Sequence, residues 1–123
     1  MSKRILVVEK NAIMFSVLKD VLEKEGHNVS LSETGEDGIR IAESDTPDLV
    51  VTDTVLPDID GFEVCRRIKS SRKRLVPKVI ITTGDIDAVD AEKAHDAGAN
   101  DYCAKTRDSL HVITAIKELV REG

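Results

Sequence analysis

The chain alternates short apolar runs with longer stretches in which apolar residues recur every three or four positions. The short runs are rich in valine, isoleucine and threonine, which favours β-strands, whereas the longer stretches favour amphipathic helices. The predicted strands lie at 5–8, 28–32, 50–53, 79–83 and 101–104. The predicted helices carry their apolar residues within 13–22, 39–42, 62–68, 87–97 and 110–120. Strands that alternate with helices predict a parallel sheet with helices on both faces, here as a single α/β domain over residues 1–123.

The central predicted strand ends on a carboxylate. Val50, Val51 and Thr52 form a β-branched run that Asp53 closes, and Pro57 prevents the strand from continuing further. The carboxyl ends of parallel strands form the edge at which open α/β sheets bind their ligands. Asp53 is therefore the first candidate for a functional residue.

Polar side chains also follow other predicted strands. Glu9 and Lys10 come after the first strand, Thr83 ends the fourth, and Lys105 follows the fifth. Because the carboxyl ends of parallel strands share one edge of the sheet, we expect these groups to gather around Asp53. Acids, a hydroxyl and a lysine at one edge indicate a site that handles an oxyanion next to a carboxylate.

Composition narrows the class of protein. The chain has 123 residues, of which 41% are hydrophobic and 33% charged, as in a soluble globular protein. It contains no apolar stretch long enough to span a membrane and no signal peptide, so we expect a cytoplasmic protein without a membrane partner. A formal charge of −5 argues against nucleic acid as a partner of this domain. Cys65 and Cys103 lack metal-ligand spacing and are expected to be reduced thiols.

The order and spacing of these features resemble the receiver domain of bacterial two-component response regulators. The segments that carry the resemblance are residues 5–9, Asp53 with Pro57 and Asp60-Gly61, Thr83-Gly84, Gly98-Ala99, and Tyr102 with Lys105. The resemblance covers nearly the whole chain and implies a flavodoxin-like, doubly wound five-stranded parallel sheet in the order 2-1-3-4-5. It also implies a signalling protein and not an enzyme, with self-phosphorylation from a phosphodonor and slow self-dephosphorylation as its only chemistry.

The same resemblance implies a role for each candidate residue. Asp53 is the phospho-acceptor, which receives a phosphoryl group from a histidine kinase, a phosphotransfer protein or a small phosphodonor. Lys105 binds that group, the hydroxyl of Thr83 moves towards it, and Tyr102 follows the hydroxyl. Thr82 is a second candidate for the switch hydroxyl, although the spacing to Lys105 favours Thr83.

The resemblance also implies a docking face for a downstream protein, formed by the fourth helix, the fifth strand and the fifth helix. Acidic residues are concentrated in or near the predicted fourth helix, at Asp85, Asp87, Asp90, Glu92 and Asp96, against the cation Lys93. We therefore expect a partner with a basic surface, whose association depends on ionic strength.

The sequence departs from the family pattern at the acidic pocket. Receiver domains usually carry two acids after the first strand, the second of which binds Mg²⁺, whereas this chain has Glu9 followed by Lys10. Mg²⁺ requires hard oxygen ligands, and an ammonium group supplies none. Glu9, Asp53 and the backbone carbonyl of Val55 remain as ligands, so we expect Mg²⁺ binding to be weak or absent. We also expect the Lys10 ammonium to act as a cation in the pocket, paired with Asp53 or Glu9.

This departure leaves an alternative function open. A pseudo-receiver keeps the fold but acts as a protein-interaction module that does not depend on phosphorylation. Two other classes fit the sequence poorly. A haloacid-dehalogenase-like phosphatase requires a second aspartate where this chain has Val55, and a flavodoxin-type flavin binder requires a glycine- and hydroxyl-rich loop where this chain has residues 9–13.

Overall fold

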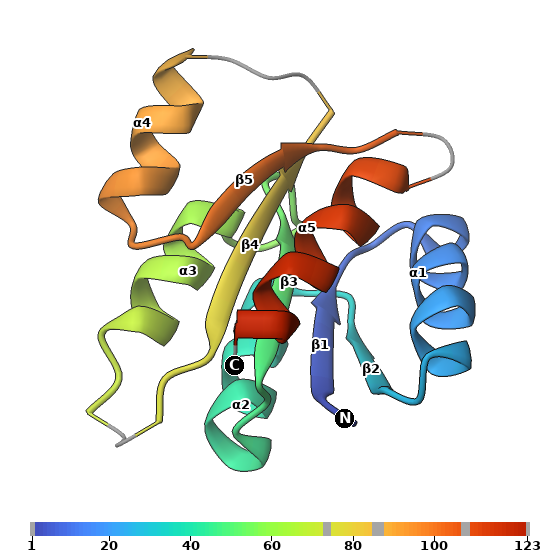
Figure 1. The fold of residues 1–123 in the computed structure, drawn as a ribbon. Coiled ribbons are helices and arrows are strands. Elements are labelled where there is room, and N and C mark those ends of the chain that lie inside the picture. The colour runs from blue at the N-terminus through green and yellow to red at the C-terminus, as the bar shows by residue number, and fades with distance from the viewer. Residues whose placement is uncertain (1, 73–74, 85–87, 107–108, 123) are drawn as a thin grey trace.

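The computed structural model describes residues 2–72, 75–84, 88–106 and 109–122. Strands and helices alternate along the chain, and the strands form one parallel sheet in the order β2-β1-β3-β4-β5 (Figure 1). The strands are β1 (Arg4–Val8), β2 (Asn28–Ser32), β3 (Leu49–Asp53), β4 (Lys78–Thr83) and β5 (Asp101–Ala104). The helices are α1 (Ala12–Lys24), α2 (Gly35–Asp45), α3 (Gly61–Lys69), α4 (Ala88–Asp96) and α5 (Leu110–Glu122). The predicted strand order is confirmed.

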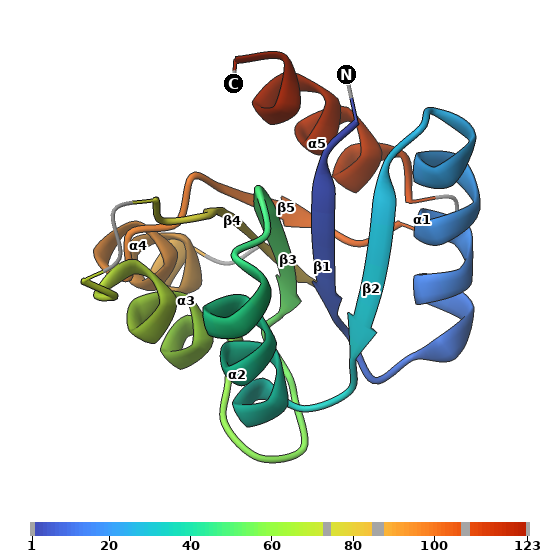
Figure 2. The same cartoon turned by 90° about the horizontal axis from the view of Figure 1, so that it is seen from below.

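The sheet separates two hydrophobic layers (Figure 2). Helices α1 and α5 cover one face, and α2, α3 and α4 cover the other. The strand register sets Val7, Val51 and Ile80 side by side on the face covered by α1 and α5. Each of these side chains is at most 3% exposed. Burial of such apolar surface, at about 25 cal/mol per Å², is the main force that holds both helix layers on the sheet.

Polar side chains begin the helices next to the carboxyl edge of the sheet. The Asn11 side chain accepts hydrogen bonds from the backbone N–H groups of Ile13 at 3.0 Å and Met14 at 3.1 Å, so it caps α1. Asp60 caps α3 in the same way. A cap of this kind stabilises a helix by about 1 kcal/mol, because it satisfies N–H groups that have no partner within the helix. These caps fix where the chain leaves the edge that carries Asp53.

The structure also bears on the predicted fourth helix, the two cysteines and the absence of a membrane span. The helix expected at 87–97 is found as α4, and Asp85 and Asp87, expected near its start, lie outside the described residues. Cys65 is buried and Cys103 half-buried, and both are free thiols, as expected. Within the described ranges, no helix combines the length and the apolar character that a membrane span requires.

Candidate functional site

Asp53 is the last residue of β3, and its side chain is 4% exposed at the carboxyl edge of the sheet. The chain returns to this point after a short loop, where the N–H of Gly61 donates to the carbonyl oxygen of Thr54 at 3.0 Å. A Cβ atom at position 61 would collide with the carbonyl oxygen of Asp53, so the close approach of the two segments requires glycine. Asp53 is thus held by a central strand, and a closed loop lies beside it.

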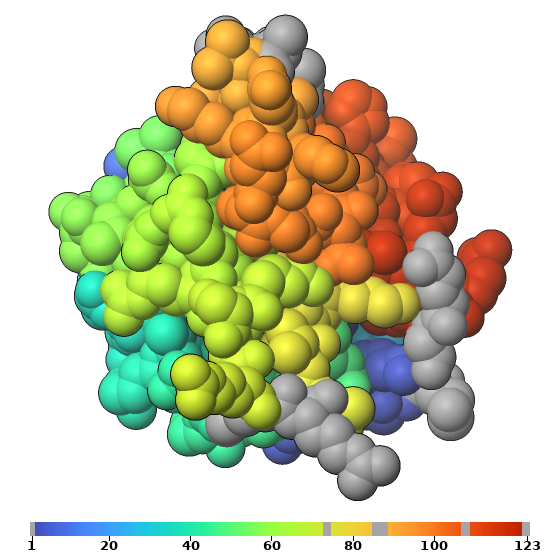
Figure 3. All heavy atoms as spheres, turned by 90° about the vertical axis from the view of Figure 1, so that its left-hand side faces the viewer, coloured from blue at the N-terminus to red at the C-terminus, as the bar shows by residue number. Residues whose placement is uncertain are grey.

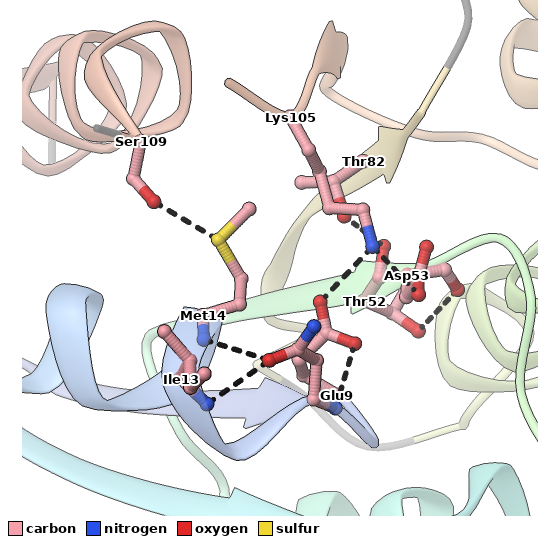
Figure 4. A network of polar contacts seen from close by, with 9 residues as sticks. Glu9, Ile13, Met14, Thr52, Asp53, Thr82, Lys105 and Ser109 are labelled. Carbon is pink, nitrogen blue, oxygen red and sulfur yellow. Dashed lines mark hydrogen bonds and ion pairs between the residues drawn. The ribbon is translucent and has the colours of Figure 1, made fainter. Parts of the chain in front are cut away.

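Lys105 joins Asp53 to a second buried carboxylate (Figure 4). Its Nζ atom lies 2.9 Å from Oδ2 of Asp53 and 3.2 Å from Oε1 of Glu9. Glu9 directly follows β1, and Lys105 directly follows β5. The other oxygen of Glu9 accepts a hydrogen bond from the backbone N–H of Asn11 at 3.3 Å. The structure therefore brings together Glu9, Asp53 and Lys105, as the sequence predicted.

The surroundings of this site shift the pKa values of Glu9 and Lys105. Burial raises the pKa of Glu9 above its ordinary value, and the negative charge of Asp53 raises it further. Burial alone would lower the pKa of Lys105, but its hydrogen bond and charge interaction with Asp53, together with Glu9, outweigh burial and raise it. Two carboxylates thus contact the same cation, and at Glu9 the contacts with Lys105 do not fully offset burial and the charge of Asp53, which together raise the pKa. The site favours additional positive charge.

The donor atoms of this site fit a hydrated magnesium ion. Mg²⁺ in proteins is held by one or two carboxylates and keeps several water molecules in its coordination shell. Glu9 and Asp53 supply carboxylate oxygens, and Val55, whose backbone carbonyl is the third expected ligand, lies in the adjoining loop and is 61% exposed. Within the described ranges, no group of three or more His, Cys, Asp or Glu side chains could hold a metal ion. The set is therefore suited to a weakly held ion and not to a closed protein cage.

The structure corrects the expectation for Lys10. This side chain is exposed, and the contacts that Asp53 and Glu9 make with an ammonium group are both to Lys105. Among the described residues, no hydrogen bond or ion pair joins Lys10 to the pocket. Lys10 lies at a bend of the chain directly after the buried Glu9, and its side chain extends into solvent. An ammonium group also gains more from hydration than from a pocket that already holds a cation.

The two threonines at the end of β4 occupy different positions. Thr82 is in register with Asp53, and its hydroxyl donates to the carbonyl oxygen of Thr52 at 3.3 Å. Thr83 is buried, and its carbonyl oxygen accepts a hydrogen bond from the N–H of Lys105 at 2.7 Å. The hydroxyl of Tyr102, on β5, is buried and has no hydrogen-bond partner among the described residues. Thr83 therefore lies at the carboxyl end of β4, the neighbour of β3, whereas Tyr102 lies on β5, one strand further away.

The sequence did not predict a contact between Ser109 and Met14 near the two carboxylates. The hydroxyl of Ser109 donates to the sulfur of Met14 at 2.9 Å and so joins the start of α5 to α1 (Figure 4). Met14 also lines a cavity of about 10 Å³ together with Glu9, Asp53 and Lys105. This space is about that of one water molecule. Met14 resembles any other apolar residue of an amphipathic helix, so nothing in the sequence marks it.

Comparison with known proteins identifies a family, proteins and solved structures to which this chain is similar. A family model described as the response regulator receiver domain matches residues 5–117. The chain is 34% identical over 119 residues to the transcriptional regulatory protein AfsQ1 of Streptomyces coelicolor, an alignment that covers 97% of this chain and 52% of that protein. It is 33% identical over 118 residues to protein PilH of Pseudomonas aeruginosa, covering 95% of this chain and 97% of PilH.

The solved structures give the same result. The crystal structure of a CheY-like response regulator receiver domain protein from Methanospirillum hungatei has a TM-score of 0.84 and 29% sequence identity, and each chain is covered over 100% of its length. The chain spans about half the length of AfsQ1 and of the regulatory protein PhoP of Bacillus subtilis, but nearly all of PilH. The similarity thus extends over this whole chain and over one part of the longer regulators.

Proposed function

Because this chain belongs to the response regulator receiver domain family of two-component signalling, we propose that it accepts a phosphoryl group on Asp53 and thereby switches a partner-binding surface. The observation that carries the proposal is the double contact of Lys105, 2.9 Å to Asp53 and 3.2 Å to Glu9. A lysine suits this role because it presents a compact positive charge to an anionic group. Apart from this self-modification and its slow reversal, we propose no enzymatic activity.

In the proposed reaction, a carboxylate oxygen of Asp53 attacks the phosphorus atom of a phosphohistidine in a kinase or phosphotransfer protein. The new P–O bond forms as the P–N bond breaks, and the imidazole leaves with the electron pair of that bond. Catalysis of such a transfer consists mainly of alignment and charge neutralisation. Lys105 supplies one cation, and Mg²⁺, when held by Glu9, Asp53 and the Val55 carbonyl, would neutralise further charge on the transferring group.

The switch is proposed to use Thr83 and Tyr102. A phosphoryl group on Asp53 carries oxygens that accept hydrogen bonds, and Thr83 has a short hydroxyl at the end of the neighbouring strand. The hydroxyl of Tyr102 is buried without a partner among the described residues, which costs about 1–3 kcal/mol. A movement of the Tyr102 side chain to a second position, in which water contacts its hydroxyl, would recover this free energy. Thr82 remains a candidate for the hydroxyl, because it lies in register with Asp53.

The proposed docking face consists of α4, β5 and α5. Figure 3 shows α4 on the outer surface, beside α3. Val89 on α4 is 63% exposed and Leu110 at the start of α5 is 58% exposed, so both helices present apolar side chains to solvent. Glu92 and Asp96 add exposed negative charge. These features support a partner that combines apolar contacts with a basic rim, and an association that weakens as ionic strength rises.

The pseudo-receiver remains the second candidate, favoured by the presence of Lys10 where the family has a metal-binding acid. The experiment that separates the two uses an acyl phosphate with Mg²⁺ as the donor and intact-protein mass spectrometry as the readout. We expect the wild type to gain the mass of one phosphoryl group and Asp53→Asn to gain none. If neither protein gains mass, the pseudo-receiver is the better account, and a gain in both would move the acceptor away from Asp53.

A further inference from the structure

Asp58 ties the loop beside Asp53 to a different helix. It lies between β3 and α3, and both of its carboxylate oxygens accept backbone hydrogen bonds from the start of α2. The N–H of Gly35 donates to Oδ1 at 2.8 Å, and the N–H of Glu36 donates to Oδ2 at 2.8 Å. These hydrogen bonds lower the pKa of Asp58, the bond from Glu36 most of all. The carboxylate is thus held in its charged form by two short contacts to one helix end.

The neighbouring residue reinforces this tie. A Cβ atom on Gly35 would lie 2.5 Å from a side-chain carbon of Ile59, so the loop rests directly on the first turn of α2 and requires glycine there. Ile59 is partly buried and packs against the hydrophobic layer beneath α2 and α3. The loop is therefore held by an apolar contact and by two hydrogen bonds at the same place.

Helix α2 does not need Asp58 as its cap. Thr34 already occupies the N-cap position, and its hydroxyl oxygen accepts a hydrogen bond from the N–H of Asp37 at 3.2 Å. Asp58 arrives from 22 and 23 residues away in sequence and satisfies two further N–H groups. Because both carboxylate oxygens of Asp58 are bound to α2, the loop itself is held in a fixed position. This holds whether or not the contacts also stabilise the helix.

The other end of the loop is fixed as well. Gly61 bonds to Thr54, and the backbone of Gly61 packs against Asp53. Val55 lies between this closure and the Asp58 contacts, and its exposed side chain contributes little to holding it. The backbone at Val55 is therefore constrained by an anchor on either side of it.

We propose that Asp58 is a positioning residue, which fixes the loop of residues 54–60 against α2 and so holds the Val55 carbonyl ready for the metal ion beside Asp53. The part that concerns the metal rests on the function proposed above, whereas the positioning of the loop does not. Pre-ordering a carbonyl ligand removes the conformational cost of ordering it when the ion binds. The same hydrogen bonds connect the start of α2 to the loop, so a ligand that moves the loop next to Asp53 also acts on α2.

The first test measures loop order without metal. Backbone ¹⁵N order parameters of residues 54–60 are compared among the wild type, Asp58→Ala, Asp58→Asn and the control Thr34→Ala. The control weakens the same end of α2 but leaves the loop contacts intact. For Asp58→Ala we expect values to fall from about 0.85, typical of rigid backbone, towards about 0.6, and Thr34→Ala to keep those of the wild type. Asp58→Asn retains one acceptor oxygen and should lie between them. An unchanged loop in Asp58→Ala, or an equal change in Thr34→Ala, would overturn the proposal.

The second test measures Mg²⁺ affinity by calorimetric titration of the same four proteins with magnesium chloride. Asp58→Ala should bind Mg²⁺ roughly tenfold more weakly than the wild type, the size of effect expected for a residue that orients a ligand, and Thr34→Ala should match the wild type. Equal affinities of wild type and Asp58→Ala would overturn the metal part of the proposal. If the wild type binds no Mg²⁺, the metal in the proposed function fails instead, and the order parameters still decide whether Asp58 positions the loop.

Discussion

Lys105 and Glu9 form an ion pair of 3.2 Å, although they follow strands β5 and β1, which are not neighbours in the sheet. To make this contact, the lysine side chain passes over the ends of β4 and β3, where it also meets Asp53 at 2.9 Å. The ion pair thus spans the carboxyl edge from the last strand to the first. Among the described residues, Lys105 is the cation that both acids contact, so its removal measures how much this contact stabilises the fold.

Lys105→Met should lower the free energy of unfolding at neutral pH. A pair of fully buried charges loses roughly 3–5 kcal/mol when one partner is removed, and we expect about 2–4 kcal/mol here because Lys105 is 22% exposed. The measurement is urea denaturation in the presence of a chelator. Lys117→Met is the matched control, since Lys117 pairs with Glu25 at 3.6 Å with both side chains well exposed, and its loss should cost less than about 1 kcal/mol. Equal losses in both variants would contradict the account of the site.

Two variants at position 10 separate a missing ligand from a repelling charge. Lys10→Asp replaces the long, exposed lysine with a short carboxylate directly after Glu9, and we expect this added hard oxygen to tighten Mg²⁺ binding by about tenfold or more and to speed phosphorylation by a small donor. Lys10→Gln removes only the charge, and because Lys10 is exposed, we expect less than about a fivefold change, the equivalent of 1 kcal/mol. Calorimetry measures both. Equal affinities of wild type and Lys10→Asp would mean that position 10 has no access to the metal.

Val51→Asp should unfold the domain. Val51 is 3% exposed in the central strand, so the substitution buries an unpaired charge and costs several kcal/mol of a total stability of about 5–15 kcal/mol. Thermal unfolding followed by circular dichroism is the measurement. Ile13→Asp, at a side chain that is 77% exposed, should keep a cooperative transition. A cooperative transition in Val51→Asp would refute the position of Val51 in the core.

The two thiols should react slowly in the native protein. Burial raises the pKa of Cys65 to about 11, and burial and the charge of Asp101 raise that of Cys103 to about 12. At pH 8, a thiol with a pKa of about 11 has about 100-fold less thiolate than one with a pKa of about 9, and thiolate is the reactive form. The reaction with a chromogenic disulfide should therefore be at least about 100-fold slower in the native than in the denatured protein, and should speed up as pH rises. A fast native reaction would show that the element carrying the reactive thiol, α3 for Cys65 or β5 for Cys103, opens readily.

The sequence predicted those features of the fold that depend on residues close together in the chain. The five strands follow from short apolar runs of neighbouring residues, and each strand begins and ends within one residue of its predicted bounds. The meeting of Glu9, Asp53 and Lys105 follows from topology, because a parallel sheet brings its strand ends to one edge.

What the sequence did not predict depends on three-dimensional contacts. The outward position of Lys10 is decided by the inward position of Glu9 and by the cation that Lys105 already supplies. The bonds of Asp58 join residues more than twenty positions apart, and an aspartate in a loop carries no mark of a distant partner. Thr82 and Thr83 are adjacent and chemically alike, so only their strand register separates them.

The central claim is that Asp53 itself carries the phosphoryl group, and reductive trapping tests it most directly. Borohydride reduces an aspartyl phosphate to homoserine, and peptide sequencing by mass spectrometry then locates the modified residue. After treatment of the wild type with an acyl phosphate and Mg²⁺, we predict homoserine at position 53 and at no other acid, with none in the untreated protein. Homoserine at Asp58 or Asp60 in place of Asp53, 5-hydroxynorvaline (the reduction product of a glutamyl phosphate) at Glu9, or the absence of any reduced residue would contradict the account.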